Sequence, residues 1–243
     1  MKQKLIAQGA EAKIFLSGNA ITKDRIKKSY RIKELDDKIR KSRTKKEIKL
    51  LTKASQIINV PLPLTDSRGG DWGSGGAQTK LKIPFIKGEK LSEHLDKFPL
   101  KKQKQICRQV GQDIAKLHDN NIIHGDLTTS NMIFVKNIVK KPVNNKTQND
   151  ARLTTSPVGG GGAVVDKNKL KIYFIDFGLG FISHKYEDRA VDIHLLKQAL
   201  EAKHYKNYKI LINEFLKGYK TSKNSAKTLN QLNKVEKRGR YKH

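Results

Sequence analysis

The sequence predicts an α+β protein of two lobes, with strands in the first part of the chain and helices in the second. Two observations support this fold class. Short alternating apolar runs fill the N-terminal part, whereas apolar residues spaced by three and four dominate after residue 100. A group of strands followed by a group of helices is typical of α+β folds, in which sheet and helices are segregated.

The composition is compatible with this fold and predicts the kind of partner. Of the 243 residues 36% are hydrophobic, and 51 Lys+Arg against 23 Asp+Glu give a formal net charge of +28. The apolar residues are clustered with clear periodicity, which argues against a wholly disordered chain. The excess of positive charge predicts a polyanionic partner, because Lys and Arg attract phosphate backbones.

The same sequence disfavours several classes of protein. Its longest charge-free stretch, residues 153–165, is shorter than the roughly 20 apolar residues of a transmembrane helix. Glu11 and Lys13 interrupt the start of the chain before the apolar core of a signal peptide could form. Cys107 is the only cysteine, so no disulfide or cysteine-based zinc site is expected. We therefore expect a cytoplasmic protein without membrane contact, also nuclear if the source is eukaryotic.

Three short strands are expected at the N-terminus. Residues 5–7 and 14–16 alternate around a turn at residues 8–10, which predicts a hairpin. Residues 20–23 continue as a third strand. The lobe is completed by a highly charged helix over residues 34–52 and by a strand over residues 81–86. The apolar positions of the predicted helix are Leu35, Ile39, Ile48 and Leu51.

The second lobe is predicted to be mostly helical. One face of a buried helix is defined by Ile106, Val110, Ile114 and Leu117. Two strands are expected over residues 132–135 and 170–175. Two further helices are marked by Ile193, Leu196 and Leu200 and by Leu211, Phe215 and Tyr219.

The two lobes are assigned to residues 1–87 and 88–243. Glycine-rich, flexible insertions are expected over about residues 65–79 and 137–169. The basic residues gather after Lys23 and near the C-terminus, where residues 234–243 are expected to form a flexible arm that binds RNA. A solvated helix face is an equally good reading of the charge over the predicted helix.

Two motifs carry the predicted chemistry. Asp126 and Asn131 are five residues apart in His-Gly-Asp-Leu-Thr-Thr-Ser-Asn, and Asp176 follows an apolar strand and precedes Phe-Gly. This spacing is typical of a kinase, in which the first Asp orients the nucleophile and the Asn and second Asp hold Mg²⁺. The alternative is that these residues only close strand ends as Asx turns. Three matching positions in the right order favour phosphoryl transfer from ATP.

A kinase also needs a cation for the phosphates and a helix carboxylate to hold that cation. Lys23 ends the third predicted strand, and Glu47 lies on the following helix. The alternative for Lys23 is one more solvated charge. Glu34 lies on the same charged segment as Glu47, so either carboxylate could instead be a surface ion-pair partner.

The nucleotide-covering turn and the adenine contacts have weaker signals. The turn is expected to cover the phosphates because it lies one hairpin before Lys23, although it lacks a GxGxxG motif and could be an ordinary hairpin turn. Its residues are Gln8, Gly9, Ala10, Glu11 and Ala12. The carbonyl of Pro84 and the N–H of Ile86 are the predicted adenine contacts, unless Pro84 merely ends an edge strand.

Three other residues are given supporting roles. His124 is expected to support the catalytic loop by hydrogen bonding. Asp192 is expected to brace the backbone of that loop, with a plain helix-start residue as the alternative. Cys107 is expected to be a small buried hydrophobe. The remaining histidines show no metal-ligand spacing and are expected to be surface or packing residues.

Several segments together resemble the PRPK family, the small atypical serine/threonine kinase of the KEOPS complex. The resemblance rests on residues 8–12, 23–31, 35–47, 124–131 and 175–183 and on Arg238-Gly239-Arg240. It covers nearly the whole chain except the two insertions.

The resemblance implies a minimal two-lobed protein-kinase-like fold with serine/threonine kinase and ATPase activity, using ATP and Mg²⁺. The implied partners are the tRNA-modifying synthase subunit of the KEOPS complex, the other KEOPS subunits and tRNA, which receives threonylcarbamoyladenosine next to its anticodon. Lys23 would pair with Glu47 and contact phosphate, and Asp126 would be the catalytic carboxylate. Asn131 and Asp176 would hold Mg²⁺. The tail residues Arg238 and Arg240 would reach the tRNA or the active site.

The chain also departs from common kinases. Gly125 stands where the usual loop has Arg, and only a short stretch separates Gly178 from the helix that bears Asp192. No extended activation segment is therefore expected. Two alternative functions stay open: a catalytically inert kinase-like scaffold for tRNA and a partner protein, or a RIO-like or small-molecule kinase.

Overall fold

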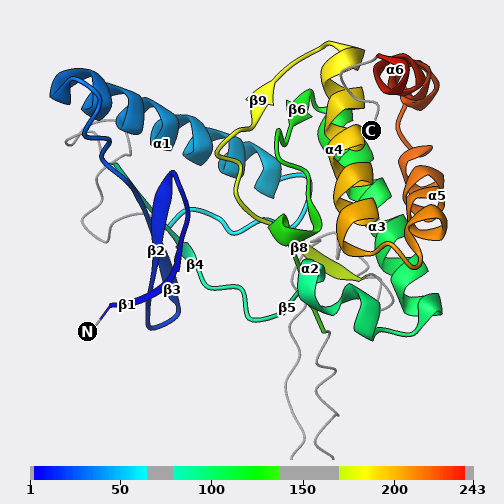
Figure 1. Ribbon diagram of the computed structural model, residues 1–243, viewed down its shortest axis with the longest axis horizontal. Helices are drawn as coiled ribbons and strands as arrows, with labels where there is room; N and C mark the ends of the chain where they lie inside the picture. The colour runs from blue at the N-terminus through cyan, green and yellow to red at the C-terminus, as the bar shows by residue number, and fades with distance from the viewer. Residues whose placement is uncertain (1–2, 65–78, 137–169, 239–243) are drawn as a thin grey trace, which may run out of the picture.

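The computed structural model describes residues 3–64, 79–136 and 170–238, and it contains the two expected lobes (Figure 1). The N-lobe has a four-stranded antiparallel sheet in the order β1-β2-β3-β4. The strands are β1 (Lys4–Gln8), β2 (Ala12–Ser17), β3 (Ala20–Arg25) and β4 (Lys80–Pro84). The predicted hairpin and third strand are confirmed. The fourth strand begins one residue before the predicted start and ends at Pro84 rather than at residue 86.

The register of this sheet decides which side chains of β3 face inward. Lys23 pairs with Ile14 of β2 and with Leu81 of β4. Because side chains alternate along a strand, Lys23 and Arg25 lie on the same face. Both are buried, although both are charged.

The charged helix α1 spans Lys33–Ser55, so the predicted helix is confirmed with slightly wider bounds. Its predicted apolar face is wrong in the first half. Leu35 is exposed there, and the buried positions are Asp36 and Thr44. Asp36 accepts hydrogen bonds from the backbone N–H of Lys28 (3.3 Å) and from Arg40 Nε (2.7 Å). This end of α1 is therefore anchored by polar bonds, which apolar spacing does not reveal.

The chain enters the C-lobe through short elements. These are β5 (Glu89–Lys90), α2 (Leu91–His94), η1 (Leu95–Lys97), α3 (Leu100–Asp119) and β6 (Ile122–Ile123). The helix α3 buries Ile106, Val110, Ile114 and Leu117, as its spacing predicts.

The segments with the predicted motifs lie between small sheets. They include η2 (Thr129–Asn131), β7 (Met132–Val135), β8 (Lys171–Phe174) and β9 (Phe181–Ile182). The strand β7 pairs with β5 and β8, and β6 pairs with β9. Both predicted strands of this lobe are confirmed, the second in shortened form. The antiparallel pairing of β7 and β8 brings the ends of the two motifs side by side.

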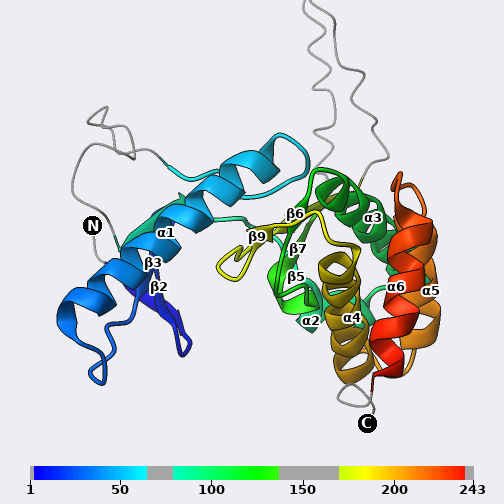
Figure 2. The same cartoon turned by 90° about the horizontal axis from the view of Figure 1, so that it is seen from above.

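Three helices complete the C-lobe: α4 (Tyr186–Lys203), α5 (Tyr208–Tyr219) and α6 (Ser225–Lys237). Figure 2 shows α6 running alongside α4. The expectation that residues 234–243 form a flexible arm is wrong for its first part, because α6 continues through Lys237. Val235 is fully buried and Leu232 nearly so, which shows that this segment packs into the core.

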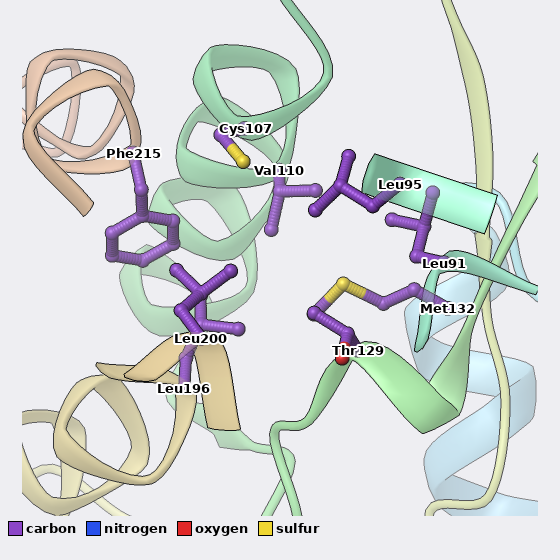
Figure 3. A pocket seen from close by; sticks show the side chains of 9 residues that line it. All are labelled: Leu91, Leu95, Cys107, Val110, Thr129, Met132, Leu196, Leu200 and Phe215. Carbon is purple, nitrogen blue, oxygen red and sulfur yellow. The ribbon is translucent and has the colours of Figure 1, made fainter. Parts of the chain in front are cut away.

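The core of the C-lobe depends on close contact between α3 and α5. A Cβ atom added to Gly111 would lie 2.1 Å from the carbonyl oxygen of Phe215, and one added to Gly218 would lie 2.0 Å from that of Arg108. Two glycines thus let the helix backbones approach each other. A small apolar pocket between α2, α3 and α4 includes Cys107, Thr129 and Met132 in its lining (Figure 3). Burial raises the pKa of Cys107 to about 12, so it is a buried hydrophobe, as expected.

Most of the two predicted glycine-rich insertions lies outside the described residues, as does Arg240. Within the described part, no helix combines the length and the apolar character required to span a bilayer.

Candidate active site

The centre of the candidate site is Lys23, which reaches across the space between the lobes. Its Nζ lies 2.9 Å from Glu47 Oε1 and 2.6 Å from Asp176 Oδ1. Glu47 is only 2% exposed, whereas Glu34 is exposed. Of the two carboxylates considered from the sequence, the structure therefore brings Glu47 to Lys23.

Arg25 also belongs to this cluster, although its role was not predicted from the sequence. Its Nη2 lies 2.6 Å from Glu47 Oε2, and the residue is 6% exposed. Glu47 thus gives one oxygen to each of two cations. The two-residue spacing from Lys23 on a strand was the available signal, because it places both side chains on one face.

Asp176 is the partner of Lys23 from the C-lobe. Its backbone is in the left-handed region with φ 62°, and its side chain is about half exposed. Burial opposes ionisation, but the ammonium of Lys23 and the N–H of Gly178 hold the pKa of Asp176 below its usual value. The carboxylate is therefore ionised near neutral pH and is suited to bind a cation.

Gly178 keeps this centre open. A Cβ atom there would lie 2.9 Å from Asp176 Oδ1 and 3.3 Å from Lys23 Nζ. A side chain would therefore crowd the two groups. Both residues after Asp176 therefore have a local reason in this structure. Gly178 leaves room for Asp176 and Lys23, and Phe177 is buried beside the ring of His124.

Asp126 and Asn131 are joined directly. Asn131 Nδ2 donates to the backbone oxygen of Asp126 and to its Oδ2, both at 2.9 Å. The backbone N–H of Ile175 donates to the backbone oxygen of Asn131 at 2.9 Å. The loop with Asp126 and Asn131 is therefore tied to the residue that precedes Asp176. An amide that donates through Nδ2 presents Oδ1 as its acceptor, which is the atom suited to a metal ion.

His124 and Asp192 hold this loop in place. The ring of His124 bonds to the backbone oxygen of Ile175 (3.1 Å) and accepts from the N–H of Asp126 (3.3 Å). Asp192 accepts from the N–H groups of His124 and Gly125, both at 2.9 Å. Both expected supporting roles are thus confirmed as contacts.

Asp192 is itself fixed from α3. His118 Nε2 lies 3.2 Å from Asp192 Oδ2, and His118 Nδ1 lies 2.9 Å from the hydroxyl of Tyr219. Burial opposes ionisation of Asp192, but the hydrogen bond from His118 holds its pKa below the usual value. From the sequence, His118 is expected only as a surface or packing residue, because its partners lie 74 and 101 residues away along the chain.

Gly125 explains one departure from common kinases. It has φ +79°, and a Cβ atom there would lie 2.4 Å from the backbone oxygen of Leu179. The catalytic loop therefore packs directly against the segment after Asp176. That segment is short, since only seven residues separate Gly178 from the start of α4. An arginine at position 125 could not occupy this place.

The predicted nucleotide-covering turn joins β1 to β2, and most of it is exposed. The N–H of Gly9 donates to the backbone oxygen of Ala12 (3.0 Å), and no atom would lie within 4 Å of a Cβ on Gly9. Glu11 pairs with Arg43 of α1 at 2.7 Å. The turn is thus tied to α1, while the role of Gln8 and Ala10 at phosphates stays a prediction.

The predicted adenine contacts lie where the chain leaves the N-lobe sheet. Pro84 is opposite Ala20 in the sheet, and the N–H of Phe85 donates to the backbone oxygen of Asn19 at 2.8 Å. The assignment of Pro84 and Ile86 to adenine stays a prediction.

Of the two predicted tail arginines, Arg238 is the one that the structure describes. It pairs with Glu187 in the first turn of α4. Its predicted contact with tRNA or the active site would require this surface pair to open.

The side chains around Lys23 can be compared with the ligand atoms that Mg²⁺ and ATP require. Asp176 offers an ionised carboxylate, Asn131 an amide oxygen, and Gly178 the space beside them. Within the described residues, no three His, Cys, Asp or Glu side chains gather into a metal site. Mg²⁺ is commonly held by one or two protein carboxylates and by substrate phosphates, so the oxygens of Asp176 and Asn131 are of the kind it needs. The residues present therefore fit the pair.

Fold and site together define a protein of the protein-kinase-like class. The small sheet with one helix, the mostly helical second lobe, and the Lys23–Glu47 pair facing Asp176 are its defining parts. A solved structure titled "WaaP in complex with acyl carrier protein" has a TM-score of 0.52 and 11% identity, covering 96% of this chain and 87% of that chain. This likeness supports the fold alone.

The sequence comparison identifies the family. The chain is 36% identical over 256 residues to the KEOPS complex subunit Bud32 of Pyrococcus abyssi, covering 98% of this chain and 96% of that protein. It is 34% identical to the EKC/KEOPS complex subunit BUD32 of Enterocytozoon bieneusi, covering 97% of this chain and 98% of that protein. The chain belongs to the Bud32 family of KEOPS complex subunits.

A third relative is a longer protein. A probable bifunctional tRNA threonylcarbamoyladenosine biosynthesis protein of Methanobrevibacter smithii is 35% identical over 100% of this chain. The chain spans only 38% of that relative. No family model matches the sequence.

Proposed function

We propose that this protein is an ATP-dependent serine/threonine kinase and ATPase that acts within the KEOPS complex and supports threonylcarbamoyladenosine modification of tRNA. The observation that carries the proposal is the position of Lys23, bonded to Glu47 of its own lobe and to Asp176 of the other. Such a cation, fixed from behind and facing a metal-binding carboxylate, is what transfer of a phosphoryl group requires.

Each residue has a role in this proposal. Lys23 binds the phosphates of ATP, and Glu47 fixes the direction of Lys23. Asp126 orients the attacking oxygen, which is a serine or threonine hydroxyl or a water molecule, and accepts its proton. Asn131 and Asp176 hold Mg²⁺. When bound, Mg²⁺ neutralises negative charge on the phosphate oxygens.

The proposed partners follow from the names of the relatives. Two are KEOPS complex subunits, and the longer one is a bifunctional tRNA threonylcarbamoyladenosine biosynthesis protein. We therefore assign this chain a tRNA-modifying synthase subunit, the other KEOPS subunits and tRNA as partners. A cytoplasmic location agrees with these partners.

The decisive experiment compares ATP hydrolysis by the wild type and Asp126→Ala, each alone and with the synthase subunit and tRNA. We expect hydrolysis that requires Asp126 and rises when both partners are present. Binding of a fluorescent ATP analogue should persist in Asp126→Ala, because Asp126 acts on the attacking oxygen rather than on the nucleotide. Equal hydrolysis by both proteins would exclude the proposed enzyme.

A catalytically inert scaffold is the second candidate function. One observation favours it: the N–H of Gly9 is bonded within its own turn to Ala12, so this group is not available to phosphate. A scaffold would bind tRNA and the partner with equal affinity in the wild type and Asp126→Ala, and neither protein would hydrolyse ATP.

A further inference from the structure

After its first turn, the outward face of α1 carries positive charge with no exposed acid among the lysines. After Asp37, every exposed charged residue of this helix is a lysine. Glu47, the remaining acid of the helix, is buried on the opposite side. Five of these residues form what we call the lysine face: Lys38, Lys41, Lys45, Lys49 and Lys53.

The lysine face is a continuous stripe. Its members are separated by three, four, four and four residues, which keeps them on one side of an α-helix. The stripe is about 22 Å long at 1.5 Å per residue. The two arginines within the same span are not part of it, because Arg40 pairs with Asp36 and Asp37 and Arg43 pairs with Glu11.

The pattern is electrostatically unfavourable for an isolated helix. Like charges at i, i+4 repel, and mixed charges on an exposed helix face are the usual way to avoid this. Among the described ion pairs, none involves the five lysines of the stripe. A bound polyanion would remove the repulsion and would release its own counterions.

We propose that the lysine face of α1 binds the phosphate backbone of RNA. Regularly spaced ammonium groups without apolar side chains between them suit a phosphate backbone better than an acidic peptide, which would also need apolar contacts. The inference uses the proposed function only for the choice of tRNA as the RNA.

The position of the lysine face determines how close bound RNA would come to the active site. Figure 2 shows α1 running along the N-lobe with its C-terminal part directed toward β6 and β9. Lys46, the next exposed lysine beside the stripe, lies 5.9 Å from the ring centre of Phe181 in β9. RNA on this face would therefore lie along the helix that carries Glu47 and would reach the segment next to the active site.

The test compares two variants of the full chain with equal net charge. In the first, all five lysines of the stripe are changed to glutamine. In the control, five exposed lysines of the C-lobe are changed to glutamine instead. The control residues are Lys101, Lys206, Lys209, Lys220 and Lys223. Glutamine keeps a similar helix propensity, so α1 should still form.

The measurement is affinity for an unmodified tRNA transcript at several salt concentrations. Each phosphate contact contributes about 0.7 to 0.9 to the slope of log K against log salt. We expect the stripe variant to lose about 3 units of slope and at least tenfold in affinity at 0.15 M salt, with the control within about one unit of the wild type. Equal slopes for the two variants would overturn the proposal, because diffuse charge would then explain the binding.

Two further binding measurements distinguish an RNA surface from an acidic protein partner and from the proposed kinase function. Polyglutamate serves as a probe for an acidic protein partner, and loss of polyglutamate binding with full retention of tRNA binding would also overturn the proposal. Binding of a fluorescent ATP analogue should be the same in all three proteins. If the wild type fails to bind the analogue while the tRNA result holds, the proposed kinase function fails and the RNA surface stands.

Discussion

Glu47 joins two cations of the candidate site rather than one. Lys23 and Arg25 each take one of its oxygens, and Lys23 also contacts Asp176. The four charges cancel in this arrangement. In the proposed function a metal ion would engage Asp176, and the remaining three groups would then carry one net positive charge toward the phosphates. That charge depends on Arg25.

Arg25→Gln should therefore weaken binding of ATP by about tenfold, equivalent to about 1.4 kcal/mol. The reason is that Lys23 would be neutralised by Glu47 alone. The measurement is titration with a fluorescent ATP analogue in the presence of Mg²⁺. Arg25→Lys should restore most of the affinity, because it restores the charge.

The matched control is Lys80→Gln. Lys80 is exposed and pairs with Asp24 on the neighbouring strand of the same sheet, so this variant removes one positive charge outside the cluster. If Arg25→Gln and Lys80→Gln bind the analogue equally well, Arg25 has no role at the phosphates.

Asp192 gives a prediction on pH. Its pKa is lowered in the folded protein, so the stability it contributes is complete above the unfolded value of about 3.9 and is lost as pH falls through the folded value. Asp192→Asn should lower the free energy of unfolding at pH 7 by about 3 kcal/mol, because a buried network loses its charge. The difference from the wild type should shrink below about pH 4. Urea unfolding at pH 7, at pH 4 and at about pH 2 measures the difference, with Asp24→Asn as a surface control. A difference that is the same at pH 7 and at about pH 2 would contradict this role.

Residues of the site differed in how well the sequence revealed them. Asp126, Asn131 and Asp176 could be predicted because fixed spacing and flanking apolar strands identify a phosphoryl-transfer loop. Arg25 could not be predicted, because a charged residue on a short strand resembles one more solvated charge in a chain with a net charge of +28. The partners of His118 were equally hidden, since hydrogen bonds between distant segments leave no local pattern.

At the scale of elements, the spacing of apolar residues predicts a helix correctly where the buried face of that helix is apolar. The helices α3, α4 and α5 follow from apolar residues spaced by three and four. The buried face of α1 follows from this spacing only near its C-terminal end, where Leu51 is buried, because Asp36, Thr44 and Glu47 occupy the buried positions before it. The helix α6 was missed for another reason: its lysines suggested an arm, although Leu232 and Val235 mark a buried face.

The crossing of α3 and α5 gives a prediction on stability. Gly218→Ala should destabilise the protein by about 2 kcal/mol, because its Cβ would lie 2.0 Å from the backbone oxygen of Arg108. In an open helix the same change would be stabilising by roughly 0.5–1 kcal/mol, so the sign is informative. We expect the thermal midpoint to fall by about 4–8 °C. Gly9→Ala, where no atom lies within 4 Å, should leave the midpoint unchanged. A midpoint that rises in Gly218→Ala would show that the helices can separate without cost.

At the scale of the whole molecule, the described contacts that join the two lobes are both ionic and apolar. The Lys23–Asp176 pair is one bond that joins them. Leu50 of α1 adds an apolar contact, since a Cβ on Gly180 would lie 3.1 Å from it. The net charge of +28 is not spread evenly over the chain. Its density on α1 is what distinguishes it from a uniform solvating shell.

Two truncations at the C-terminus distinguish residues that stabilise the fold from residues that bind RNA. Removal of residues 234–243 deletes Val235, which is fully buried, and Glu236, which bonds to Lys197 of α4 at 2.8 Å. Removal of residues 239–243 deletes neither. The longer truncation should therefore lower the free energy of unfolding by about 2 kcal/mol or more, from the lost burial of one valine and the lost packing around it.

The shorter truncation should keep the thermal midpoint and the affinity for an ATP analogue, while tRNA binding weakens through loss of Arg240 and its neighbours. Both truncations are followed by thermal unfolding and by tRNA titration at fixed salt. Because the lysine face of α1 remains in both, each truncated protein should still bind tRNA more tightly than the variant with that face neutralised. Complete loss of tRNA binding in the shorter truncation would instead assign the whole interaction to the tail.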